Sequence, residues 1–166
     1  MQTYQAFSWE HGMTWLAKLP KAHELEFDLE PKPKTNGRHV LVVSRAVREE
    51  SHHRPLNGLP FVTLIWEKDR IGAYLSSDYY SIINVDDSMA RWADANESKR
   101  RVRIVCDGES VGVCVGDAAE PLCSSSRFAE AIRESPERGM ATFRGENVRI
   151  SNIAVRRNSE SGKTQR

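Results

Sequence analysis

The stretch RVRIVCDGESVGVCV, Arg101 to Val115, carries the clearest hairpin signal in the chain. Asp107-Gly108 is a two-residue turn of the kind that accepts positive φ at low steric cost. Pairing across this turn sets the following residues opposite each other: Cys106 with Glu109, Val102 with Val113 and Ile104 with Val111, and on the other face Arg101 with Cys114 and Arg103 with Gly112. Because a one-residue slip would bury the arginines, we predict an antiparallel sheet with one face on a core.

The size and charge of the chain limit what it can be. At 166 residues it is long enough to bury a core, and we assign residues 1–157 to one β-sandwich domain and the polar stretch 158–166 to a disordered tail. The formal net charge is +1, with 24 basic and 23 acidic residues, which gives no global electrostatic basis for binding nucleic acid or a membrane. No apolar run approaches eighteen residues, so no membrane span is expected.

The number of cysteines and the N-terminal sequence indicate in which cellular compartment the protein is expected and whether it is expected to bind a metal. Three cysteines (Cys106, Cys114 and Cys123) and the lack of a secretory signal predict free thiols in a cytoplasmic protein, although a secreted protein trimmed of its signal would look the same. No CxxC motif occurs, so we expect no metal site and no cofactor. Asp86-Asp87 offers oxygen ligands for Ca²⁺, but no motif marks the others. The sequence leaves the oligomeric state open.

Alternating segments predict further strands. HELEFDLE at 23–30 places three apolar residues on one face and acids on the other, which is typical of a half-buried strand. A second hairpin around Lys68-Asp69 is predicted to oppose Trp66 with Ile71, Leu64 with Ala73 and Val62 with Leu75.

Helical patterns and a phase change complete the expected architecture. Short helices are predicted at Ser88–Glu97 and Arg127–Glu134. In the last strand the apolar phase shifts at Ser151-Asn152, which predicts a bulge. About eight to ten strands, mostly joined as hairpins, with two or three short helices in connections, indicate an all-β antiparallel sandwich or jelly roll.

Three stretches resemble the concanavalin A-like lectin/glucanase superfamily, which includes laminin-G-like domains. They are LEFDLEP (25–31), RVRIVCDGESVGVCVGD (101–117) and GMATFRGENVRISNIAVRR (139–157), and the resemblance covers roughly residues 23–157. It implies two curved antiparallel sheets with a concave face on which many relatives bind or cleave glycans. Our leading hypothesis is therefore a carbohydrate-associated domain that binds a saccharide on its concave sheet.

A second hypothesis is a glycoside hydrolase or lyase. In the glucanase branch a Glu-x-Asp-x-Glu strand carries the catalytic carboxylates, and that resemblance would make Glu26 the nucleophile, Asp28 its tuning partner and Glu30 the acid/base. Residues i and i+4 of a strand lie about 13 Å apart, so the side chains would have to converge toward the ~5.5 Å separation of a retaining pair. Alternatively, these acids form a solvated face. The enzyme hypothesis predicts that Glu26→Gln abolishes turnover at an unchanged melting temperature.

Saccharide sites combine aromatic platforms with planar polar groups. The candidate ligand-binding residues are Tyr74, Tyr79, Tyr80, Asp78, Arg101 and Arg103. Tyr74 is expected on an exposed face, and the two arginines either bind an acidic sugar or form a solvated stripe. Trp66 and Trp92 are also considered, but are expected in the core and as a helix anchor. A protein-interaction module is the third hypothesis.

Overall fold

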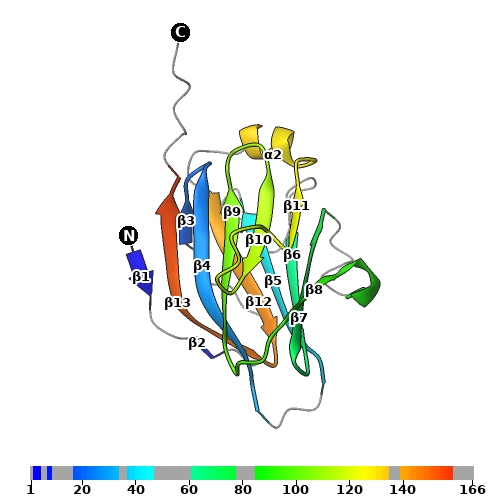
Figure 1. Cartoon of the computed structure of the whole chain (residues 1–166). Helices are drawn as coiled ribbons and strands as arrows, with labels where there is room; N and C mark the ends of the chain where they lie inside the picture. The colour runs from blue at the N-terminus through cyan, green and yellow to red at the C-terminus, as the bar shows by residue number, and fades with distance from the viewer. Residues whose placement is uncertain are drawn as a thin grey trace.

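The computed structural model describes residues 2–4, 7–8, 17–33, 37–46, 61–77, 85–134 and 139–158, which form two antiparallel sheets (Figure 1). Sheet A follows the order β1 (Gln2–Tyr4), β13 (Val148–Arg157), β4 (His23–Pro31), β9 (Arg100–Cys106), β10 (Val111–Val115) and β11 (Cys123–Ser125), and β2 (Phe7–Ser8) also pairs with β13. Sheet B follows the order β3 (Ala17–Leu19), β12 (Gly139–Glu146), β5 (His39–Ala46), β6 (Phe61–Glu67), β7 (Arg70–Ser76) and β8 (Arg91–Asp94). The predicted all-β sandwich is confirmed.

The hairpin of the opening stretch is confirmed, but its predicted register is wrong by two residues. Cys106 pairs with Val111 instead of Glu109. The reason is Asp107, whose carboxylate accepts hydrogen bonds from the backbone N–H groups of Glu109 (2.8 Å) and Ser110 (2.6 Å), so that the turn uses four residues. A shift of two leaves every side chain on its predicted face, and alternation alone therefore cannot detect it.

Two finer predictions about the strands are confirmed. The β6–β7 hairpin has the expected register, with Trp66 opposite Ile71. The bulge in β13 occurs where its pairing with β4 shifts between Ser151 and Ala154, and Asn152 there has φ of 51°.

The helix predicted at Ser88–Glu97 is wrong. The segment forms a 3-10 turn, η2 (Asp87–Met89), followed by strand β8. A ten-residue helix is marginal by itself, whereas the open edge of β7 offers unpaired backbone groups to Arg91–Asp94. The other expected helix is confirmed in shorter form as α2 (Ala129–Glu134), which lies near one end of the sandwich (Figure 1).

Consecutive strands β12 and β13 lie in different sheets, although a single residue, Asn147, separates them. Asn147 has φ of 55°, and its carbonyl accepts hydrogen bonds from the Lys32 N–H (2.9 Å) and the His39 ring (2.7 Å). These bonds hold the corner at which the chain passes from sheet B to sheet A.

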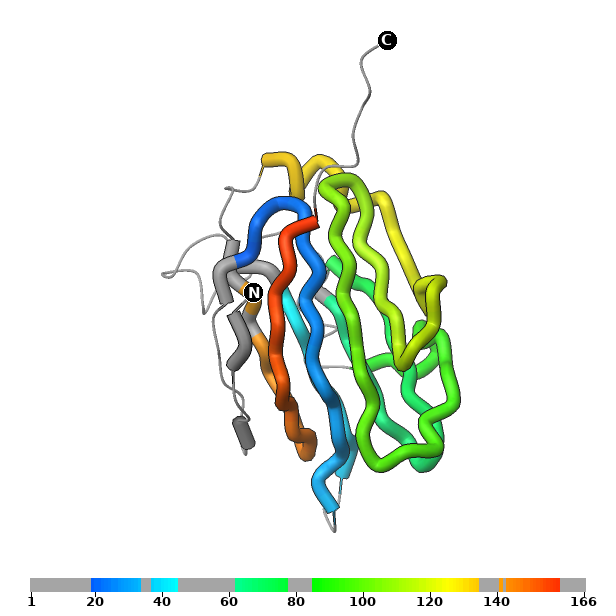
Figure 2. Tube along the Cα trace, turned by 60° about the vertical axis from the view of Figure 1, so that its left-hand side comes forward, coloured from blue at the N-terminus to red at the C-terminus, as the bar shows by residue number. Residues whose placement is uncertain are grey.

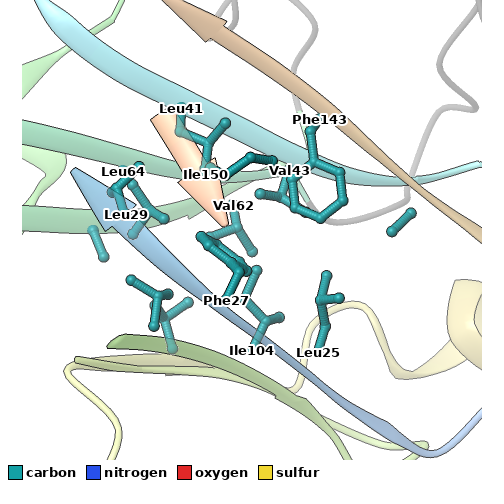
Figure 3. Packing of buried hydrophobic residues seen from close by; sticks show 14 of the residues in the cluster. Leu25, Phe27, Leu29, Leu41, Val43, Val62, Leu64, Ile104, Phe143 and Ile150 are labelled. Atoms are coloured by element: carbon teal, nitrogen blue, oxygen red, sulfur yellow. The ribbon is translucent and has the colours of Figure 1, made fainter. Parts of the chain in front are cut away.

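The core lies between the two sheets and is centred on β4. Leu25, Phe27 and Leu29 project from β4 into it and are almost fully buried (Figure 3). The ring of Phe27 meets that of Phe143 from sheet B edge to face, with ring centroids 5.6 Å apart. The apolar side chains on the inner face of β4 therefore pack against sheet B and hold the two sheets together.

Replacing Phe27 by alanine should lower the free energy of unfolding by about 3–5 kcal/mol, because the substitution leaves a cavity that the packed sheets cannot close. Urea denaturation of the variant and the wild type would measure this change in the free energy of unfolding. Met89→Ala, at an exposed position, is the matched control and should change stability by less than about 0.5 kcal/mol. Equal effects of the two substitutions would contradict this account of the core.

Candidate functional site

The structure brings five of the predicted site residues together on the outer face of sheet A. Strands β13, β4 and β9 run side by side there (Figure 2). Glu26, Asp28 and Glu30 lie on β4, and the register places Arg103 opposite Glu26 and Arg101 opposite Asp28. Residues opposed across antiparallel strands have Cβ atoms about 5 Å apart, so their charged groups can pair directly.

Arg101 connects the two central carboxylates of this face. Its Nη1 donates to Glu26 Oε1, and its Nε lies 2.8 Å from Asp28 Oδ1. The side chains of Glu26 and Asp28 are only 12% and 5% exposed, whereas that of Arg101 is 39% exposed. Burying a carboxylate costs several kcal/mol unless a hydrogen-bonded countercharge accompanies it, and Arg101 supplies that charge for both. The expected solvated face is therefore wrong for Glu26 and Asp28.

Sequence reasoning missed the partners that come from β13 and from the loop before β9. Arg156 lies 3.2 Å from Glu26 Oε2, and Arg149 donates to Glu30 Oε1 at 2.6 Å. The remaining contacts are made to Asp28 Oδ2, from Asn152 Nδ2 at 2.7 Å and from Lys99 Nζ at 3.3 Å. The only sequence signal was the phase change in β13, because the bulge brings Asn152 beside Asp28.

We refer to these residues as the charged ladder: Glu26, Asp28, Glu30, Lys99, Arg101, Arg103, Arg149, Asn152 and Arg156. Both carboxylate oxygens of Glu26 and of Asp28 are engaged by ladder partners, and Oε1 of Glu30 is engaged by Arg149. A nucleophile or proton donor would first have to release these partners. The exposed guanidinium groups, by contrast, can donate to a polar ligand without rearrangement.

Tyr74 does not occupy the exposed position expected for it. It points to the outer face of sheet B and is 3% exposed. The connection that precedes β8 crosses this face: Val85 packs on Val40 and Val42 of β5, and the Cβ of Ala90 lies over β7 beside Gly72. The other candidates in this region, Asp78, Tyr79 and Tyr80, lie outside the described residues.

The aspartates considered for calcium have other partners. Asp86 accepts hydrogen bonds from the Ser88 hydroxyl (2.6 Å) and backbone N–H (2.9 Å), which hold the pKa of Asp86 below its usual value. Asp87 forms an ion pair with Arg38 at 3.1 Å, and Arg38 also donates to the Val85 carbonyl. Within the described part of the chain, no group of three or more His, Cys, Asp or Glu side chains could hold a metal ion.

Comparison with solved structures shows which fold this arrangement represents. Sheep galectin-11 in complex with glycerol aligns with a TM-score of 0.51 at 9% identity, over 90% of this chain and 100% of the galectin. The carbohydrate binding module CBM66 from Bacillus subtilis aligns with a TM-score of 0.51 at 10% identity, over 90% and 84% of the two chains. A. japonicus CB05 aligns with a TM-score of 0.58 at 8% identity, over 99% of this chain but 27% of its own.

This chain has the concanavalin A-like jelly-roll fold. The predicted resemblance is thereby confirmed at the level of the fold, which is what likeness at such low identity shows. No protein-family model and no curated protein sequence matches the chain. None of the helices in the described part of the jelly roll has the length and apolar character that crossing a bilayer requires.

The jelly roll contains three free cysteines, and Cys123 is held as an unreactive thiol. Burial raises the pKa of Cys123 to about 11, against a smaller opposing effect of Arg91. The thiolate is the reactive form, so iodoacetamide at pH 8 should label Cys123 about a hundredfold more slowly in the folded protein than in guanidinium chloride. The labelling rate should rise with pH up to about 11.

Peptide mass spectrometry would distinguish Cys123 from the more deeply buried Cys106 and Cys114. Equal labelling rates for Cys123 in the folded and unfolded chain would contradict the raised pKa.

Removing the Arg101 guanidinium should destabilise the jelly roll strongly. Arg101→Met leaves Glu26 and Asp28 buried with fewer countercharges, and we expect a loss of about 3 kcal/mol in the free energy of unfolding. Arg103→Met is the matched control on the same strand and face, because the hydrogen bond of Arg103 goes to the Ala118 carbonyl (2.6 Å) and not to a buried carboxylate.

Urea denaturation of both variants tests this account. Equal stability of the Arg101→Met variant and the wild type would show that the two carboxylates do not depend on Arg101. By the same reasoning Glu26→Gln should lower the melting temperature, contrary to the expectation drawn from the enzyme hypothesis.

Proposed function

We propose that this protein is a saccharide-binding domain whose contact surface is the charged ladder, and that its ligand there is an acidic saccharide. The observation that carries the proposal is that the basic side chains of the ladder are more exposed to solvent than the carboxylates of Glu26 and Asp28. The side chains of Arg149 and Arg156 are 46% and 55% exposed, whereas those of Glu26 and Asp28 are almost buried. A ligand that approaches this face therefore meets cationic groups first.

The chemistry of guanidinium groups supports this ligand class. A guanidinium has five N–H donors in a planar fork that matches the two oxygens of a carboxylate or of a sulfate. Arg101, Arg149 and Arg156 come from two strands that flank β4, so their donors border the face on both sides. A uronate or sulfated sugar offers acceptors to both sides, while one of its hydroxyl groups can donate to Oε2 of the partly exposed Glu30, because Arg149 engages Oε1.

The similar structures support carbohydrate association in general terms. One is named as a carbohydrate binding module and another is a galectin. Binding is favoured over hydrolysis or lysis through Glu26 and Glu30, because arginines already engage both carboxylate oxygens of Glu26, the nucleophile of that reaction, and Oε1 of Glu30. The third hypothesis, a protein-interaction module, would be favoured by a stable protein partner in a pulldown together with the absence of binding to any saccharide.

The test is binding to a panel of immobilised oligosaccharides, followed by calorimetric titration with alginate and sulfated galactan oligosaccharides. The wild type should bind at least one acidic probe. Arg149→Gln and Arg156→Gln should each weaken that binding about tenfold, which corresponds to about 1.4 kcal/mol for a charged hydrogen bond. Both variants should fold, because Glu30 is partly exposed and Glu26 keeps Arg101.

Arg144→Gln is the matched control, since Arg144 is an exposed arginine on sheet B. It should bind the acidic probe like the wild type. Equal losses in Arg144→Gln and Arg156→Gln would refute the ladder as the contact surface, and no binding to any probe would refute the saccharide-binding function itself.

A further inference from the structure

Trp92 occupies an unusual position on the edge strand β8. It lies opposite Gly72 on the outer face of sheet B. A Cβ atom on Gly72 would lie 2.9 Å from Trp92 Cε3, closer than real Cβ contacts come, so the indole ring lies directly against the backbone of β7. The absence of a side chain at Gly72 is what allows this close approach.

Trp92 is also the one partly exposed aromatic ring among the side chains that the structure describes. The other aromatic side chains in that set are buried: Phe27, Trp66, Tyr74, Phe128 and Phe143. A tryptophan that serves only the core has no reason to lie on an outer face beside solvent, whereas a partly exposed ring held in place against a sheet suits stacking of a ligand.

One face of this ring is already in contact with a cation. The Arg70 guanidinium carbon lies over the ring, 4.1 Å from its centroid, and Arg70 donates to Glu67 Oε2 from Nη2 (2.6 Å) and from Nε (3.1 Å). This pairing with Arg70 holds the pKa of Glu67 below its ordinary value. Asp94 is exposed on β8 opposite Arg70. The ring, the guanidinium and the carboxylate thus form a row across three neighbouring strands.

We propose that Trp92, Arg70 and Glu67 form a second saccharide subsite, the edge subsite, which takes a neutral sugar. The apolar face of a pyranose can stack on the part of the indole ring that Arg70 leaves uncovered, while Arg70 donates to hydroxyl groups and Glu67 accepts from them. Arg70 is already paired with Glu67 and lies opposite Asp94, so its guanidinium is not an unpaired cation that would select an acidic sugar. The inference rests on the proposed saccharide-binding function but uses different residues and a different ligand.

The edge subsite and the charged ladder lie on the outer faces of opposite sheets, separated by the core. Because the two surfaces face in opposite directions with both packed sheets between them, a short oligosaccharide lying on one surface does not contact the other. The two subsites should therefore bind independently, and one molecule could link two saccharide chains.

The experiment is a calorimetric titration of the full chain with lactose, cellohexaose, xylohexaose and an inulin-type fructo-oligosaccharide. The wild type should bind at least one of these neutral probes, with unchanged affinity when alginate oligosaccharide saturates the charged ladder. Trp92→Ala should weaken neutral binding at least tenfold and leave alginate binding unchanged. Glu67→Gln, at an exposed pair whose loss does not threaten folding, should also weaken neutral binding severalfold.

Met89→Ala is the matched control, because Met89 is an exposed apolar residue that precedes β8. Neutral binding that survives both Trp92→Ala and Glu67→Gln, or that alginate displaces, would overturn the edge subsite while leaving the charged ladder intact. Binding of acidic probes alone would also overturn it. Failure of every neutral and acidic probe would overturn the proposed function as well.

Discussion

The interaction on which sheet A depends is the pairing of Arg101 with two carboxylates that β4 buries on its outer face. The same strand buries Leu25, Phe27 and Leu29 on its other face, so side chains on both faces of β4 are buried. Hydrophobic packing stabilises the inner face, but the outer face carries Glu26 and Asp28 and is stable only if their charges are matched. Arg101, reaching across from β9, matches both.

The outer faces of the two sheets differ in the side chains that they carry: charged on sheet A, and partly apolar on sheet B. On sheet A, long basic side chains cover short acidic ones and leave cationic groups in contact with solvent. On sheet B, Val85 from the segment before β8 packs on the valines of β5, and Tyr74 is buried. At the edge of sheet B, Trp92 lies over Gly72 and stays partly exposed.

The jelly-roll fold is compatible with binding and with catalysis, so the distinction has to come from the side chains. A catalytic carboxylate needs an oxygen atom free to reach its substrate, whereas Glu26 and Asp28 use both oxygens to hold arginines and other donors. The same contacts present guanidinium groups in fixed positions, which is the arrangement that recognition of a polar ligand requires.

The sequence by itself determined the class of fold, the β6–β7 register and the bulge in β13, because local alternation and turn residues decide which face each side chain takes. It did not determine the β9–β10 register, since a slip of two residues preserves every face and only the hydrogen bonds of Asp107 distinguish the alternatives. Nor could it show that Arg149 and Arg156 reach the acids of β4, that Tyr74 is covered, or that Trp92 lies on a strand. These depend on which strands become neighbours and which connection crosses a sheet, and such long-range pairings leave no local periodicity in the chain.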